Sequence, residues 1–147
     1  QMSKQDLVDD EQEERGVIIN TASIAAFEGQ IGQVAYTASK AALSSITKNL
    51  SKSLAKDGIL VNCVCPGTIV TASFTEVLSD ILAADGLDAT DPTDVMTWID
   101  NNFHQPCDLG RAGMPEEIAS ITVYLASRRN GYVTGATVNV DGGSDFV

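Results

Sequence analysis

Three short runs of apolar, β-branched residues alternate along this chain with longer segments of helical periodicity. The runs cover residues 17–21, 59–65 and 136–140, and a glycine, proline or serine follows each within two positions. Runs of this length and composition are typical of buried parallel strands. Between the first two, apolar residues recur every three or four positions from residue 34 to about residue 57, and Gly58 ends the pattern. This order of strand, long helix and strand predicts a right-handed βαβ unit.

The remaining pattern predicts a less regular segment and then one more helix and strand. Residues 68–110 show no sustained period, so we expect irregular structure with short helices around residues 74–82 and 92–101. A connection of this length usually carries function as a lid or a binding segment. Pro115 and the two glutamates after it predict a helix start, because proline fits a first helical turn and acidic side chains favour the positive end of the helix dipole. That helix should run to about Ala126.

These elements together predict an α/β fold in which helices cover a parallel sheet. Three such strands would leave one edge of the sheet with unpaired backbone of a buried type. We therefore expect further strands from sequence upstream of Gln1. On this interpretation residues 1–147 are the carboxy-terminal part of a single domain.

Composition and charge narrow the class of partner. The chain has 147 residues with 44% hydrophobic composition, enough for the core of one ordinary domain. Acidic residues outnumber basic ones 20 to 9, and the net charge of −11 argues against nucleic acid or an anionic membrane as a partner and favours a small-molecule substrate. The three cysteines form no CxxC pair, which favours a reducing compartment, the cytoplasm or alternatively the mitochondrial matrix.

Candidate chemistry gathers near the first strand and the start of the long helix. Tyr36 and Lys40 are four residues apart, so their side chains share one helix face. A tyrosine titrates near pH ~10, and a neighbouring ammonium group favours the phenolate, as proton transfer to a carbonyl requires. Ser23 and Pro66-Gly67 follow strands, and ligands bind at the carboxyl ends of strands in open α/β sheets. Alternatively, Tyr36 and Lys40 form an exposed pair without a role, and Ser23 is a turn or helix-cap serine.

Three ordered segments resemble signatures of the short-chain dehydrogenase/reductase family. They are Asn20-Thr21-Ala22-Ser23, Tyr36-Thr37-Ala38-Ser39-Lys40 and Val61-Asn62-Cys63-Val64-Cys65-Pro66-Gly67. Two further segments, Leu109 to Ala119 and Thr134 to Gly143, resemble the last helix and last strand of that family. The resemblance implies the carboxy-terminal portion of a Rossmann-type doubly wound parallel sheet. It also implies an NAD(P)-dependent oxidoreductase that interconverts a secondary alcohol and a ketone by hydride transfer.

The same resemblance implies roles for individual residues. Tyr36 matches the general acid/base, Lys40 the residue that lowers its pKa and binds the nicotinamide ribose, and Ser23 the group that orients the substrate oxygen. The cofactor would be NAD or NADP. The residues that match the segment bordering the nicotinamide are Pro66, Gly67, Ile69 and Thr71.

The sequence also departs from the family pattern. It contains no counterpart of the glycine-rich first turn, of the residue that chooses between NAD and NADP, or of the fourth catalytic residue, an asparagine. Because the cofactor pyrophosphate normally sits on that turn, we expect the isolated chain to bind cofactor poorly.

The sequence leaves the substrate class and the role of the isolated chain open. Residues 15–33 resemble type 2 3-hydroxyacyl-CoA dehydrogenases, and the chain after Lys40 is more like 3-oxoacyl carrier-protein reductases, which favours an acyl thioester. A steroid, polyol or small alcohol is the alternative. A rival interpretation is an inactive fragment that acts only in structure or subunit contact, since the resemblance places the long helix in the interface of a homodimer or homotetramer. In the long loop, Trp98, Phe103 and His104 either line a pocket or anchor the loop.

Overall fold

The computed structural model describes residues 2, 16–29 and 32–144, and a three-stranded sheet lies at their centre. The strands are β1 (Gly16–Thr21), β2 (Ile59–Pro66) and β3 (Thr137–Val140). All are parallel, in the order β1-β2-β3, with Gly16 opposite Ile59 and Cys63 opposite Thr137. The predicted parallel α/β architecture is confirmed, and each strand lies within one residue of its predicted bounds.

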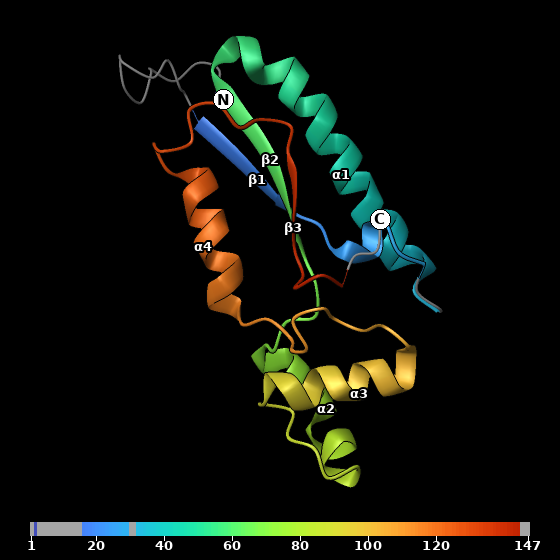
Figure 1. The fold of residues 1–147 in the computed structure, drawn as a ribbon. Coiled ribbons are helices and arrows are strands. Elements are labelled where there is room, and N and C mark those ends of the chain that lie inside the picture. The colour runs from blue at the N-terminus through green and yellow to red at the C-terminus, as the bar shows by residue number, and fades with distance from the viewer. Residues whose placement is uncertain (1, 3–15, 30–31, 145–147) are drawn as a thin grey trace.

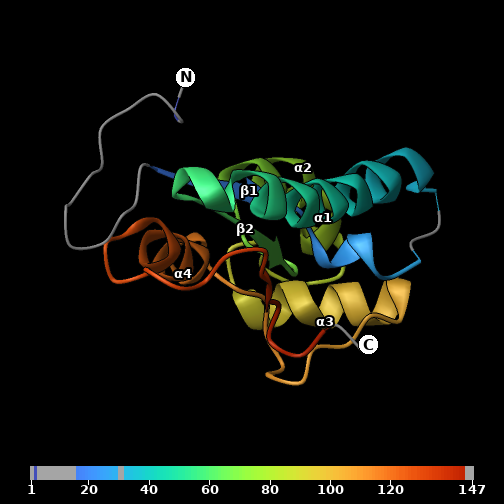
Figure 2. The ribbon, with the colours of Figure 1, turned by 90° about the horizontal axis from the view of Figure 1, so that it is seen from above.

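Helices cover both faces of this sheet. Figures 1 and 2 show α1 (Val34–Leu54) along one face and α4 (Pro115–Ala126) along the other. The short helix η3 (Ala55–Asp57) extends α1, and Gly58 ends it with a φ of 67°, a left-handed conformation that glycine adopts without steric cost. None of the helices that the structure describes combines the length and apolar character needed to cross a bilayer.

The central strand β2 is the most buried element of the sheet. Cys63 and Cys65 are both fully buried and pack with Ala22 and with Leu43 of α1, as predicted for small core residues on one face of a strand. Burial, together with the neighbouring Cys63, raises the pKa of the Cys65 thiol to about 12. These thiols are therefore packing groups and not nucleophiles.

Residue Asn62, also on β2, holds the chain that leads into β3. Its buried amide donates from Nδ2 to the carbonyl of Val133 at 2.8 Å and accepts at Oδ1 from the amide of Ala136 at 3.1 Å. A buried polar side chain is stable only when such bonds satisfy it. Asn62 thus sets the path by which the chain enters β3.

Beyond the carboxyl ends of the strands, α2 (Ala72–Ala84) and α3 (Pro92–Phe103) form a separate lobe, residues 70–112 (Figure 1). The lobe has its own buried cluster, built around Leu82 and Val95, against which Trp98 packs. Its two ends meet in a neck, where the amide of Val70 donates to Gly113 and the amide of Gly113 donates to Thr68, each at 2.9 Å. The predicted short helices are confirmed, and both are longer and more regular than expected.

Candidate functional site

Ser23, Tyr36 and Lys40 come together between the end of β1 and the start of α1. The Lys40 Nζ atom donates to the carbonyl of Thr21 at 3.0 Å and lies 5.5 Å from the centroid of the Tyr36 ring. This distance is within the range of a cation–π contact. Lys40 is therefore anchored to the end of β1 while its charge faces the phenol.

The Ser23 hydroxyl caps a short helix. It accepts a hydrogen bond of 3.2 Å from the amide of Ala25 at the start of η2 (Ile24–Ala26). The cap fixes the serine at the point where the chain leaves β1. The interpretation of Ser23 as a cap serine is therefore confirmed. Ser23 also lines a cavity beside Tyr36, and its role with a substrate stays a prediction.

This cavity has a volume of about 590 Å³ and lies between the sheet and the lobe. Ser23, Tyr36 and Gly67 line it on the side of the sheet. The lobe contributes Phe74, Ile99, Asn102, Phe103, His104 and Gln105. Among the described residues that line the cavity, none is a lysine, arginine, aspartate or glutamate. The site thus combines apolar surface with uncharged polar groups, an arrangement typical of small-molecule pockets.

The segment predicted to border a nicotinamide divides into two parts. Gly67 and Ile69 line the cavity, whereas Pro66 and Thr71 do not. Pro66 is the last residue of β2, and the Thr71 hydroxyl caps α2 by accepting from the amide of Phe74 at 3.2 Å. A Cβ at Gly67 would come within 2.8 Å of the Cα of Asp141, so the close approach of these two backbones requires glycine.

Comparison with known proteins shows which family this chain belongs to. The family model described as enoyl-(acyl carrier protein) reductase matches residues 5–145. The chain belongs to the short-chain dehydrogenase/reductase family. A 3-oxoacyl-(acyl-carrier-protein) reductase from Chlamydia pneumoniae is 41% identical over 131 residues, which are 89% of this chain and 46% of that relative.

Solved structures of other short-chain dehydrogenases/reductases share the fold. L-sorbose reductase from Gluconobacter frateurii, complexed with NADPH and L-sorbose, superposes with a TM-score of 0.77 at 32% identity over 90% of this chain and 48% of that one. A type-2 3-hydroxyacyl-CoA dehydrogenase from Mycobacterium avium gives a TM-score of 0.71 at 30% identity over 99% of this chain and 48% of that one. The chain therefore spans about half the length of the relatives that it matches.

Several residues that line the cavity belong to no motif that the sequence shows. Phe74, Ile99 and Asn102 lie in a segment without a motif, and only the packing of the lobe brings them opposite Tyr36. Phe103 and His104 line the cavity, whereas Trp98 anchors the lobe and contacts Phe103 edge to face at 5.6 Å. Both interpretations of these loop aromatics thus hold, each for different residues.

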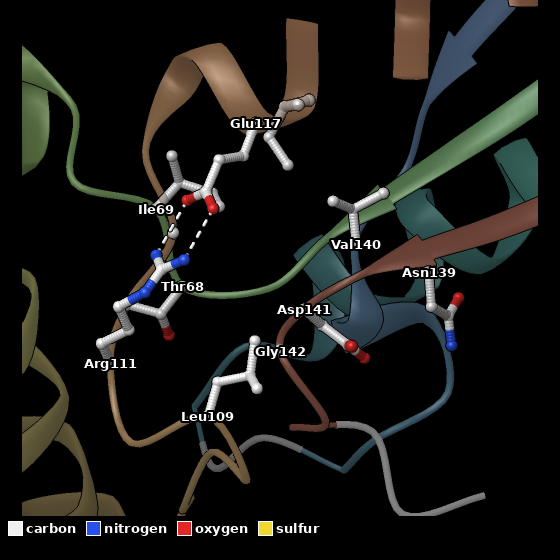
Figure 3. Close-up of a pocket in the computed structure, with 11 residues that line it drawn as sticks. Thr68, Ile69, Leu109, Arg111, Glu117, Asn139, Val140, Asp141 and Gly142 are labelled. Atoms are coloured by element: carbon white, nitrogen blue, oxygen red, sulfur yellow. Dashed lines mark hydrogen bonds and ion pairs between the residues drawn. The ribbon is translucent and has the colours of Figure 1, made fainter. Parts of the chain in front are cut away.

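A second cavity of about 210 Å³ lies beside the amino terminus of α4 (Figure 3). Its charged groups are engaged, since Arg111 donates to both oxygens of Glu117, at 2.9 and 2.7 Å. Glu117 Oε2 also accepts from the amide of Met114 at 2.8 Å, which caps the helix. These bonds, that of Arg111 first and that of Met114 second, lower the pKa of Glu117 to about 2. This corner is a helix cap and not a candidate catalytic site.

Proposed function

We propose that the protein carrying this chain is an NAD(P)-dependent oxidoreductase that interconverts a secondary alcohol and a ketone. The observation that carries the proposal is the position of Lys40, 5.5 Å from the Tyr36 ring and held by the carbonyl of Thr21, at a cavity lined by Tyr36 and Ser23. We further propose that these residues form the carboxy-terminal part of a single dinucleotide-binding domain. Within the described chain β1 pairs only with β2, so its outer edge is free for a further strand.

In this mechanism the Tyr36 hydroxyl donates a proton to the substrate oxygen during reduction and accepts it during oxidation. The Lys40 ammonium stabilises the negative charge that the phenol oxygen carries once its proton has left. Ser23 retains its hydroxyl proton as a donor, because its bond to the amide of Ala25 uses an oxygen lone pair. That proton can hold the substrate oxygen beside Tyr36.

The cavity fits the nicotinamide end of NAD or NADP. Its wall at Gly67 and Ile69 is backbone and apolar side chain, and its described lining holds no lysine or arginine that would repel the nicotinamide ring, which is positively charged in the oxidised cofactor. Gly67, Ile69 and Lys40 would hold this end of the cofactor, with Pro66 and Thr71 fixing the ends of the segment. When bound, the cofactor supplies or accepts the hydride. The complex of the Gluconobacter relative with NADPH favours NADP as the first cofactor to test.

For the substrate we propose a 3-oxoacyl or 3-hydroxyacyl thioester. The support comes from the names of the Chlamydia and Mycobacterium relatives, which act on substrates of this class, and from the apolar residues Phe74, Ile99 and Phe103 along the cavity. A sugar is the alternative, as in the Gluconobacter relative. Turnover of acetoacetyl-CoA and of L-sorbose separates the two classes.

The test is turnover by the full-length protein, followed as oxidation of NADPH and NADH. Tyr36→Phe removes the hydroxyl and keeps the ring, so the rate should fall by about 10²-fold to 10⁴-fold while cofactor binding persists. Glu76→Gln, at an exposed site on α2 outside the cavity lining, is the control and should keep the rate. Unchanged turnover in Tyr36→Phe would rule out the proposed role.

A second candidate function is subunit contact, and it is compatible with catalysis in a whole enzyme. Helix α1 exposes Val34 and Ile46 by 79% and 46%. Apolar side chains on one exposed helix suit a protein interface. We propose a homodimer or homotetramer of the full-length protein, to be measured by light scattering. If the chain serves only in assembly, Tyr36→Phe should leave every measured property unchanged.

The free thiols of Cys63, Cys65 and Cys107 fit a cytoplasmic location for the protein.

A further inference from the structure

His104 has a left-handed backbone conformation, which is uncommon for residues other than glycine. It follows the last turn of α3 with a φ of 55° and ψ of 45°, and among the described residues it is the one non-glycine position with positive φ. Its amide donates to the carbonyl of Asp100 at 2.9 Å and closes the helix. Glycine is the usual residue at such a position because a Cβ is strained there. A strained residue that lines a cavity is a reason to look for a function of its side chain.

The imidazole of His104 is available to a ligand. It forms no hydrogen bond or ion pair with any residue that the structure describes, and His104 lines the same cavity as Ser23 and Tyr36. Its neighbour Asn102 differs, because the Asn102 amide donates to the carbonyl of Trp98 at 2.9 Å. An imidazole offers one donor and one acceptor, or two donors. His104 can therefore bind an oxygen atom on the lobe side of the cavity.

The remaining lining residues define what kind of molecule carries that oxygen. Because the described lining holds no lysine, arginine or carboxylate, a charged group would find no fixed counter-charge in this cavity. Phe74, Ile99 and Phe103 supply apolar surface for the carbon chain of a substrate. The cavity thus suits an uncharged chain with one oxygen beside Tyr36 and another beside His104.

We propose that His104 is a specificity-determining residue, which hydrogen-bonds a second, uncharged oxygen of the substrate beyond the reacting carbonyl. This inference rests on the proposed function, and it adds a requirement for that second oxygen. In a 3-oxoacyl thioester the second oxygen is the thioester carbonyl, and in a hydroxyketone it is the hydroxyl. A ketone without a second oxygen lacks this contact and should be a poorer substrate.

The test is His104→Gly in the full-length protein, because glycine keeps the left-handed backbone and removes the side chain with its imidazole. Three substrates are compared by kcat/KM: acetoacetyl-CoA, a hydroxyketone and a plain ketone of similar length. The loss of one hydrogen bond should lower kcat/KM by about 5-fold to 10-fold for the substrate class whose second oxygen is bound. The plain ketone should change little, and the melting temperature should not fall.

A matched control variant and the rate of the unmodified enzyme separate a structural role of His104 from a failure of the proposed function. Asn101→Gly loosens the same helix end at an exposed residue outside the cavity lining, and it should leave the substrate ratios unchanged. Equal loss for all three substrates, or a lower melting temperature with unchanged ratios, would show that His104 is structural and would overturn this inference alone. If the unmodified enzyme reduces no ketone with either cofactor, the proposed function fails and this inference fails with it.

Discussion

Replacing Lys40 with methionine should slow turnover through its effect on Tyr36, and the structure sets the size of that effect. A unit positive charge 5.5 Å from the centre of the phenol ring stabilises a full negative charge there by about 3 kcal/mol at an effective dielectric constant of about 20. The value falls to about 0.8 kcal/mol at the dielectric constant of water. Tyr36 is 44% exposed in this structure, but a bound cofactor and substrate would exclude water from the cavity.

We therefore expect Lys40→Met to reduce kcat by about 10²-fold at saturating cofactor, which corresponds to the larger of these two energies. Methionine keeps much of the length of the side chain and removes the charge. Measuring kcat with cofactor in excess separates this effect from weaker binding of the ribose, which would appear in the KM for the cofactor. The assay is the initial rate of NADPH oxidation by the full-length protein.

A double-mutant cycle with Tyr36→Phe tests the reasoning. If Lys40 acts through the phenol, then Lys40→Met should cost little further rate once the hydroxyl is gone. A loss of about 10²-fold in the Tyr36→Phe background as well would refute the electrostatic account. Lys48→Met, on an exposed part of the same helix outside the cavity, controls for the change of net charge and should leave kcat unchanged.

Three further predictions concern stability and thiol chemistry. Asn62→Ala breaks two buried hydrogen bonds and should lower the free energy of unfolding in urea by about 2 to 4 kcal/mol, and a change no larger than that of Asn101→Ala would contradict this role. The pKa of Glu117 is lowered to about 2 on folding, so its contribution to stability is present above pH 4.5 and is lost as the pH falls toward 2. Glu117→Gln should flatten that acid-dependent loss, and an unchanged acid titration of stability would argue against the cap. Because Cys65 is buried and the pKa of its thiol is raised to about 12, Ellman's reagent at pH 8 should label it only after denaturation, and prompt labelling of the folded protein would contradict its core position.

Local sequence patterns predicted much of the fold because local interactions determine those parts. The period of α1, the stop at Gly58 and the buried runs of β1 and β2 each depend on neighbouring residues, and all are confirmed. The spacing of Tyr36 and Lys40 predicted a shared helix face, and their contact at 5.5 Å confirms it. Their chemical roles stay predictions, which the exchanges above test.

Other features depend on contacts between distant residues, which no local pattern records. The acids after Pro115 predicted a helix start, but the hydrogen bonds from Arg111 to Glu117 join two residues six apart across a turn. On the lobe side of the cavity, Phe103 and His104 were predicted as one of two alternatives, but Phe74, Ile99 and Asn102 were not, because only the packing around Leu82 and Val95 brings them to the cavity. The left-handed backbone of His104 was unforeseen for a similar reason, since glycine is the residue that signals such a turn in a sequence.

The neck between Val70 and Gly113 has a consequence for how this protein could change over evolution. Two backbone hydrogen bonds hold the entry and exit of the lobe together, and the lobe has a hydrophobic cluster of its own. Insertions, deletions and exchanges between the two ends need not disturb the end of β1 and the start of α1, where Ser23 and Tyr36 lie. New substrate preferences could therefore arise by replacing the lobe, while Ser23, Tyr36 and Lys40, the proposed catalytic residues, are kept. The lobe can be exchanged as a unit, and replacing residues 70–112 with the matching segment of a relative is a direct way to alter substrate selectivity.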